Sequence, residues 1–88
     1  MKKISERSIN ALYKGLETLE NAITVISEDI EKGENYLGDK PDKWRDSEIG
    51  ERYEEWIENI DYQKDELENI KHDLEMLLNE FDSLQHFE

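Results

Sequence analysis

The feature that most constrains the fold is a heptad pattern of apolar residues between Ile49 and Leu84. Apolar side chains recur at alternating steps of four and three for about five repeats, and only Gln63 interrupts them. The series is Ile49, Tyr53, Trp56, Ile60, Gln63, Leu67, Ile70, Leu74, Leu77, Phe81 and Leu84. Because the residues in between are mostly acidic, this stretch predicts a long amphipathic helix that buries one stripe against other helices.

A second heptad series predicts a helix over about residues 5–32. Its members are Ile9, Leu12, Leu16, Leu19, Ile23, Ile26 and Ile30. Gly33 is expected to end this helix, since glycine is common just past a helix C-terminus. Gly15, beside the series, either marks a close helix crossing or has no structural role.

The stretch between the two series, residues 33–46, is expected to be a connection. Pro41 disfavours helix before it and is suited to opening a short helical turn after it. Asp46 or Ser47 then caps a long helix over about residues 47–86.

These elements predict an all-α fold, with residues 1–88 forming one antiparallel helical hairpin with coiled-coil-like seams. The first series spans about 31 Å and the second about 52 Å, at 1.5 Å per residue. The long helix should therefore overhang the short one. The overhang would expose an apolar end made of Leu77, Leu78, Phe81, Leu84 and Phe87. This end is expected to be the oligomer interface of a homodimer that forms a four-helix bundle; a bent or frayed long helix covering its own end is the alternative.

The composition excludes several ways of stabilising the fold and indicates where the chain is located. Charged residues make up 40% of it and there is no cysteine, so neither disulfides nor thiolate metal sites can stabilise the fold. An N-terminal signal sequence and an apolar segment of about 20 residues are both missing, so we expect a cytoplasmic location and no association with membranes.

The net charge of −13 is unevenly distributed. Residues 1–32 hold five basic and six acidic side chains, whereas residues 33–88 hold six and eighteen, a net −12. Direct binding to nucleic acid is disfavoured, because each phosphate contact needs a cation. Basic protein surfaces are the favoured partners. The alternative is that the acidity only keeps a small oligomer soluble.

Acidic residues recur at intervals of seven along the long helix and form the candidate partner-binding face. The residues are Glu54, Asp61, Glu68, Glu75 and Asp82, with Glu58 and Asp65 in a neighbouring row. Such rows could imitate the phosphates of nucleic acid, although a solvated helix face has the same pattern. Trp44, in the connection, is the best aromatic candidate for a partner contact.

No residues form a plausible catalytic or metal site, so we expect a protein that is not an enzyme and has no cofactor. The carboxylates of Glu55, Glu58 and Asp61 lie outside the seam, with no facing acidic cluster to complete a magnesium site. His72 and His86 fall on the outward face, away from any nucleophile.

The segment 41–60 resembles a pattern in uncharacterised small acidic helical-hairpin proteins of bacteriophages and plasmids. The matching positions are Pro41, Trp44, Ser47, Glu48, Gly50, Tyr53, Trp56 and Ile57. The resemblance implies a helical hairpin in a bacterial host cell, and small acidic phage proteins often inhibit a host enzyme or defence protein. We therefore expect a non-enzymatic acidic protein-binding module, such as an inhibitor of a host nucleic-acid-handling or defence protein. The alternative is a structural or assembly coiled-coil module that acts through its apolar C-terminal end.

Overall fold

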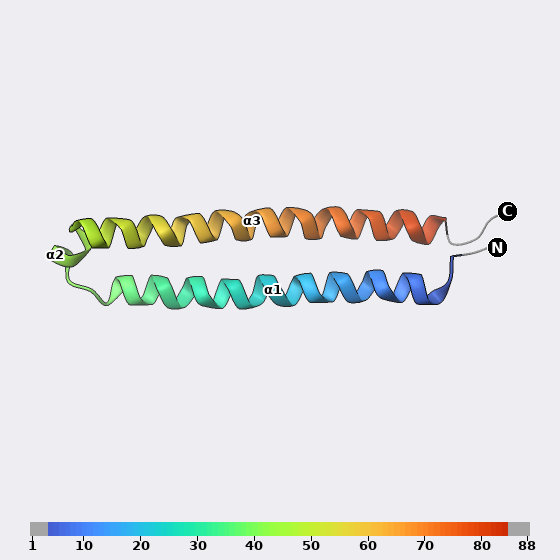
Figure 1. Ribbon diagram of the computed structural model, residues 1–88, viewed down its shortest axis with the longest axis horizontal. Coiled ribbons are helices and arrows are strands. Elements are labelled where there is room, and N and C mark those ends of the chain that lie inside the picture. The colour runs from blue at the N-terminus through green and yellow to red at the C-terminus, as the bar shows by residue number, and fades with distance from the viewer. Residues whose placement is uncertain (1–3, 85–88) are drawn as a thin grey trace.

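The computed structural model describes residues 4–84, which form two long antiparallel helices joined by a short third helix (Figure 1). Helix α1 spans Glu6–Gly38, α2 spans Asp42–Arg45 and α3 spans Glu48–Ser83. α1 and α3 lie side by side in an elongated hairpin whose Cα atoms extend over 68 × 14 × 12 Å. The predicted all-α class is confirmed, and the elongated shape agrees with the predicted hairpin.

The helix starts follow from side-chain capping and from proline. The Ser5 hydroxyl accepts a hydrogen bond from the Ser8 N–H at the start of α1, and Ser47 accepts one from the Gly50 N–H at the start of α3. Pro41 directly precedes α2, as its fixed φ angle favours. The sequence expectations for Pro41 and Ser47 are confirmed.

Gly33 does not end the first helix, and that expectation was wrong. α1 continues to Gly38, so the connection is shorter than residues 33–46. Gly33 is buried, and a Cβ atom placed on it would lie 3.0 Å from Cδ1 of Ile57. The glycine at this position therefore permits close packing of α1 against α3 rather than a chain turn.

The expected C-terminal overhang is also absent. α1 has 33 residues and α3 has 36, so the two helices cover one another almost completely. At the open end of the hairpin, the Tyr13 hydroxyl donates a hydrogen bond to the Asp82 carboxylate at 3.3 Å. Ile9 and Leu78 are only 8% and 3% exposed. The overhang was inferred from the apolar series alone, which omitted the part of α1 beyond Ile30.

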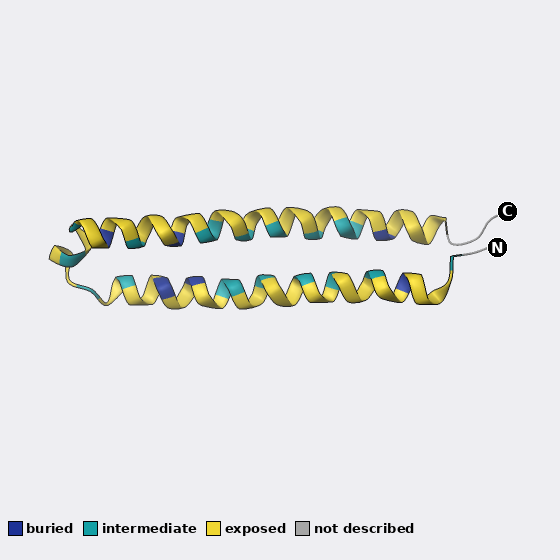
Figure 2. Ribbon diagram, viewed as in Figure 1, coloured by how far each residue is buried: buried dark blue, intermediate teal, exposed yellow. Residues whose placement is uncertain are grey.

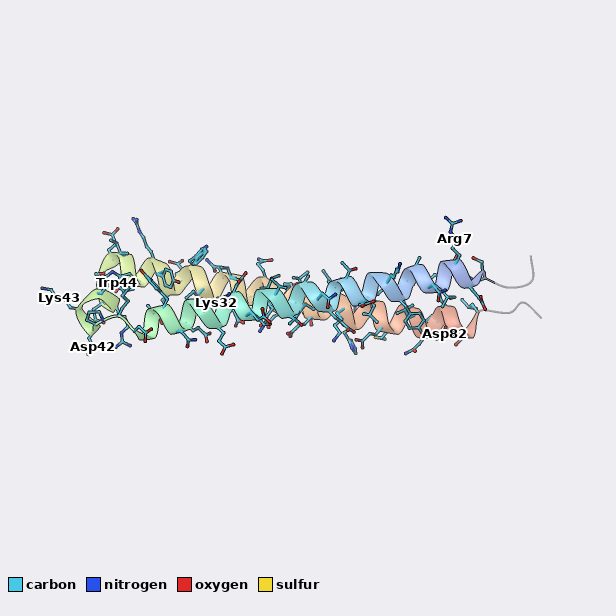
Figure 3. The ribbon with its side chains drawn as sticks, turned by 90° about the horizontal axis from the view of Figure 1, so that it is seen from below. Arg7, Lys32, Asp42, Lys43, Trp44 and Asp82 are labelled. Atoms are coloured by element: carbon cyan, nitrogen blue, oxygen red, sulfur yellow. The ribbon has the colours of Figure 1, made fainter. Side chains whose placement is uncertain are left out.

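The seam of α1 is the one that the sequence predicts. Ile9 and Ile30 are buried, and the other five members of the series are half-buried (Figure 2). The pattern continues through Gly33 and Leu37, which are also shielded. In Figure 3 the two helices cross one another, as expected when a seven-residue repeat is kept over several turns.

Only one of the two heptad positions predicted for the seam of α3 lies in the seam of the structure. Tyr53, Ile60, Leu67 and Leu74 are half-buried as expected. The other half of the seam is displaced by one residue and consists of Gly50, Ile57, Lys64, Lys71 and Leu78. Large apolar residues that were expected there remain outside, with Trp56 56% and Leu77 53% exposed.

The closed end of the hairpin explains this displacement. A Cβ atom on Gly50 would overlap the carbonyl oxygens of Trp44 and Arg45, so only glycine allows α2 to fold onto the start of α3. With Gly50 held against α2, the residues at intervals of seven after it follow into the seam. Lys64 and Lys71 tolerate this position because long side chains can bury their stems and keep the ammonium group in water.

Candidate protein-interaction surfaces

The heptad register gives the hairpin two unlike sides, one acidic and one apolar. Two observations fix which residues of α1 and α3 share the acidic side. Tyr13 reaches Asp82 across the seam, and a groove on the same side is lined by Glu20 and Thr24 of α1 together with Glu68 and Glu75 of α3. On the other side, Asp29 and Tyr36 of α1 line a groove with Trp56.

We define the acidic face as the two heptad positions of each helix that flank the seam on the Tyr13 side. Its thirteen carboxylates are Glu6, Glu17, Glu20, Glu31, Glu34, Glu51, Glu54, Glu58, Asp61, Asp65, Glu68, Glu75 and Asp82. These heptad positions contain no lysine or arginine along α1 and α3. Thirteen of the chain's 24 acidic side chains are therefore on one face, and the lysines that pair with two of them, Lys64 and Lys71, come from the seam of α3.

The predicted acidic residues differ in whether they form ion pairs. Glu58 and Asp65 are exposed, and no ion pair is formed by either among the described residues. Asp61 lies 3.2 Å from the Lys64 ammonium, and Glu75 lies 3.7 Å from that of Lys71. Both of these ion pairs lie within α3, whereas Asp82 accepts its hydrogen bond from Tyr13 of α1.

The carboxylates around Lys64 affect its ionisation. A hydrogen bond to Asp61, with the surrounding carboxylates of Glu68 and Asp65, raises the pKa of the Lys64 ammonium above its ordinary value. The lysine therefore keeps its charge throughout the neutral range, and it partly neutralises the acidic row at the level of Asp61.

Trp44 lies away from the acidic rows, at the closed end (Figure 3). Its ring packs edge-on against Tyr36 and Tyr53, with centroids 6.0 and 6.2 Å apart. The Lys40 ammonium lies over the rings of Tyr36 and Trp44, at 4.6 and 5.2 Å from their centroids. Trp44 is thus half-buried in an aromatic cluster that closes the hairpin.

Sequence reasoning missed the acids that α1 adds to this face. Counted by segment, residues 1–32 are almost neutral, because Arg7, Lys14 and Lys32 offset the acids in that count. In the helix these cations fall on other sides than Glu17 and Glu20. The offset of each residue from the seam could have separated them, whereas a net charge could not.

We define the apolar face as the side of the hairpin opposite to the acidic face. From α3 it contains Ile49, Trp56, Gln63, Ile70, Leu77 and Leu84; from α1 it contains Ser8, Ala11, Gly15, Thr18, Ala22, Val25, Asp29, Lys32 and Tyr36. Its large apolar residues are between 46% and 65% exposed. Because they recur at intervals of seven, they form a continuous stripe rather than scattered surface residues.

The residues predicted for an oligomer interface are distributed over three environments. Leu77 and Leu84 lie on the apolar face, and Phe81, 37% exposed, lies at the end of the seam. Leu78 is buried inside the hairpin, so its side chain is not available to another copy. Phe87 lies outside the described residues.

Within residues 4–84, no set of three or more histidine, aspartate or glutamate side chains is placed to hold a metal ion. None of the helices in the described part of the chain is long and apolar enough to span a membrane. No protein-family model, curated protein or solved structure matches the chain. What it can bind is therefore judged from the two faces themselves.

Proposed function

We propose that this chain is a non-enzymatic protein-binding module that engages a basic protein surface through its acidic face. It does so as a homodimer, in which two hairpins form a four-helix bundle. The observation that carries the proposal is the separation of side chains. One face has thirteen carboxylates at heptad positions that hold no lysine or arginine, and the other has a stripe of large apolar residues.

The separation matters for both interactions. Acids spaced more closely than the Debye length, about 8 Å at physiological salt, add their fields and attract a basic partner rapidly. Two copies of a chain with net charge −13 could associate only if their acidic faces stayed apart. An apolar face on the opposite side of the hairpin satisfies that condition.

The same face is compatible with a more specific role. Its carboxylate rows follow the hairpin as phosphates follow a nucleic-acid strand, so the protein could occupy the binding groove of a nucleic-acid-handling protein. With the resemblance to phage and plasmid proteins, this favours an inhibitor of a host nucleic-acid-handling or defence protein in the bacterial cytoplasm.

A pair of triple charge reversals tests the proposal. Glu58→Lys, Asp65→Lys and Glu68→Lys change the acidic face without touching the acids that pair with lysines. The control changes Glu66→Lys, Asp73→Lys and Glu80→Lys, which are exposed positions on the other side of α3. Both variants have the same composition change and the same net charge.

The assay is capture of basic proteins from a bacterial lysate on immobilised protein, followed by elution with duplex DNA. We expect the native chain and the control variant to retain the same proteins and to release them to DNA. The acidic-face variant should retain none of them. If both variants lose the bound proteins equally, only net charge matters and the proposed face is wrong.

A second candidate function is a structural or assembly module that acts through the apolar C-terminal end. Leu77 and Leu84 favour it, since they are 53% and 64% exposed. Replacing Leu77, Phe81 and Leu84 with asparagine should then abolish capture while helicity remains. Under the acidic-face proposal, the salt-sensitive capture of basic proteins should survive this change.

A further inference from the structure

We infer that a hollow near the closed end of the hairpin binds a small organic cation that carries N-methyl groups, such as a quaternary ammonium ion. Such a site needs neither the acidic face nor a second copy of the chain, so it is independent of the proposed function. Three aromatic rings and one carboxylate in the lining of the hollow account for this chemistry.

The hollow lies between α1 and α3 on the apolar face and has a volume of about 410 Å³. Isoleucine and aromatic side chains make up most of its lining, and Asp29 and Lys32 are its charged members. Ligand sites are typically concave and mostly apolar, with a few polar groups, and they enclose about 300–1,000 Å³. A hollow at the lower end of that range suits a small ligand.

The three aromatic rings form a cage with an open side. Tyr53 is half-buried and contacts both of the others, with its ring centroid 5.1 Å from that of Tyr36 and 5.6 Å from that of Trp56. Its ring is tilted by 50° and 51° relative to those two rings. Tyr36 and Trp56 are 46% and 56% exposed, so much of each ring is available to a ligand.

Ring faces favour a cation. The face of an aromatic ring carries negative partial charge and attracts a positively charged group, and cages of such rings recognise quaternary ammonium ions. The chain already uses neighbouring ring faces in this way. The Lys40 ammonium lies 4.6 Å from the ring centroid of Tyr36 and 5.2 Å from that of Trp44. Since N-methyl groups are apolar on the outside, they also suit the isoleucines of the hollow.

The two charged residues of the lining act in opposite directions. Within residues 4–84, neither Asp29 nor Lys32 forms an ion pair. Asp29 has a short side chain, which keeps its carboxylate at the hollow. Lys32 has a long flexible stem, which can lie along apolar surface while its ammonium group extends into water. Asp29 therefore adds to the attraction of a cation, whereas an anion would meet the carboxylate and three ring faces.

Ring currents give a direct test of binding. The N-methyl proton resonance of choline is followed by NMR as full-length protein is added, and a methyl group over a ring face shifts upfield. The neutral probe is 3,3-dimethylbutan-1-ol, which has the same shape with carbon in place of nitrogen. The protein carries Ile70→Glu, outside the hollow, so that a second copy does not cover the apolar face. In equal sodium chloride, choline should show a saturable shift and bind about fivefold more tightly than the alcohol.

Matched substitutions locate the site. Trp56→Leu should weaken choline binding about fivefold. The control, Tyr62→Leu, changes an aromatic residue of α3 that is 62% exposed and does not line the hollow, so it should bind choline unchanged. Asp29→Asn should weaken binding and Lys32→Gln should strengthen it, which is the reverse of what an anion site would show. Circular dichroism checks that each variant remains helical.

Several outcomes would overturn the inference. Equal affinities for choline and the alcohol would show that the hollow accepts any apolar group. An equal loss in Trp56→Leu and Tyr62→Leu, or no saturable shift at all, would rule out the site. A peptide with trimethyllysine presents the same group on a protein chain, and tighter binding of that peptide would overturn the assignment to a small free cation.

The acidic face is separated from the hollow by one further variant. Glu58→Lys, Asp65→Lys and Glu68→Lys, which should abolish the capture of basic proteins, should leave choline binding unchanged. Loss of choline binding in this variant would mean that the carboxylate rows hold the cation, and the hollow would be wrong. A chain that binds choline and captures no basic protein would refute the proposed function alone.

Discussion

Replacing two neighbouring leucines with alanine tests the displaced seam of α3 directly. Leu77 and Leu78 are adjacent and lie in the same helix, so Leu→Ala changes helix propensity equally at both positions. The apolar series of the sequence places Leu77 in the seam, whereas in the structure Leu78 is 3% exposed and Leu77 53% exposed. Only the two environments differ.

The expected magnitudes follow from burial. Leu→Ala removes three methyl or methylene groups, worth about 2.4 kcal/mol if fully buried, at 0.8 kcal/mol each. For Leu78 nearly all of this is lost, and the cavity left behind brings the cost to about 2–5 kcal/mol. For Leu77, with less than half of its surface covered, the cost is about 1 kcal/mol.

The measurement is urea and thermal unfolding followed by circular dichroism, in the Ile70→Glu background to exclude a second copy. In a domain of this size, each kcal/mol lowers Tm by about 4–8 °C, so Leu78→Ala should melt at least about 5 °C below Leu77→Ala. Equal losses, or a larger loss for Leu77→Ala, would show that the seam passes through Leu77 and that the displacement is wrong.

Three further changes test the closed end and the seam. Gly50→Ala should lower Tm although alanine favours helix by about 1 kcal/mol, because its Cβ would displace the Trp44 carbonyl; tryptophan fluorescence should change with it. Ser47→Ala should cost about 1 kcal/mol of unfolding free energy in urea titrations, since the Gly50 N–H loses its capping oxygen. The Lys64 pKa is raised by Asp61, so its stabilising effect is present below the unfolded-state pKa and is lost as pH rises through the folded-state pKa. Tm should therefore fall at alkaline pH less steeply in Lys64→Gln than in the native chain; an unchanged slope would contradict this.

Much of the fold could be read from the sequence because helical periodicity is a local property. The series from Ile9 to Ile30 contains only one heptad phase with large apolar residues, and the structure shields every member of it. Pro41 and Ser47 act on the residues next to them, so their roles were also predictable. No information from the partner helix is needed for any of these.

The end of α1 and the phase of α3 required tertiary structure. Gly33 has the same local preferences in either role, and only the approach of Ile57 makes it a packing residue. Along α3, both candidate phases carry apolar residues, and the one with more of them remained outside. Contact between Gly50 and the carbonyls of α2 selects the other phase, and no local pattern records that contact.

The candidate surfaces divide in the same way. The sequence by itself determined the acidic rows of residues 48–83, because a heptad spacing places them on one side of any helix. Only the pairing of α1 with α3 added Glu6, Glu17, Glu20, Glu31 and Glu34 to that side. The pairing also left Trp56, Ile70 and Leu77 uncovered on the other. A helix fixes the angle between its own residues, but which angle faces another helix is decided by packing between them.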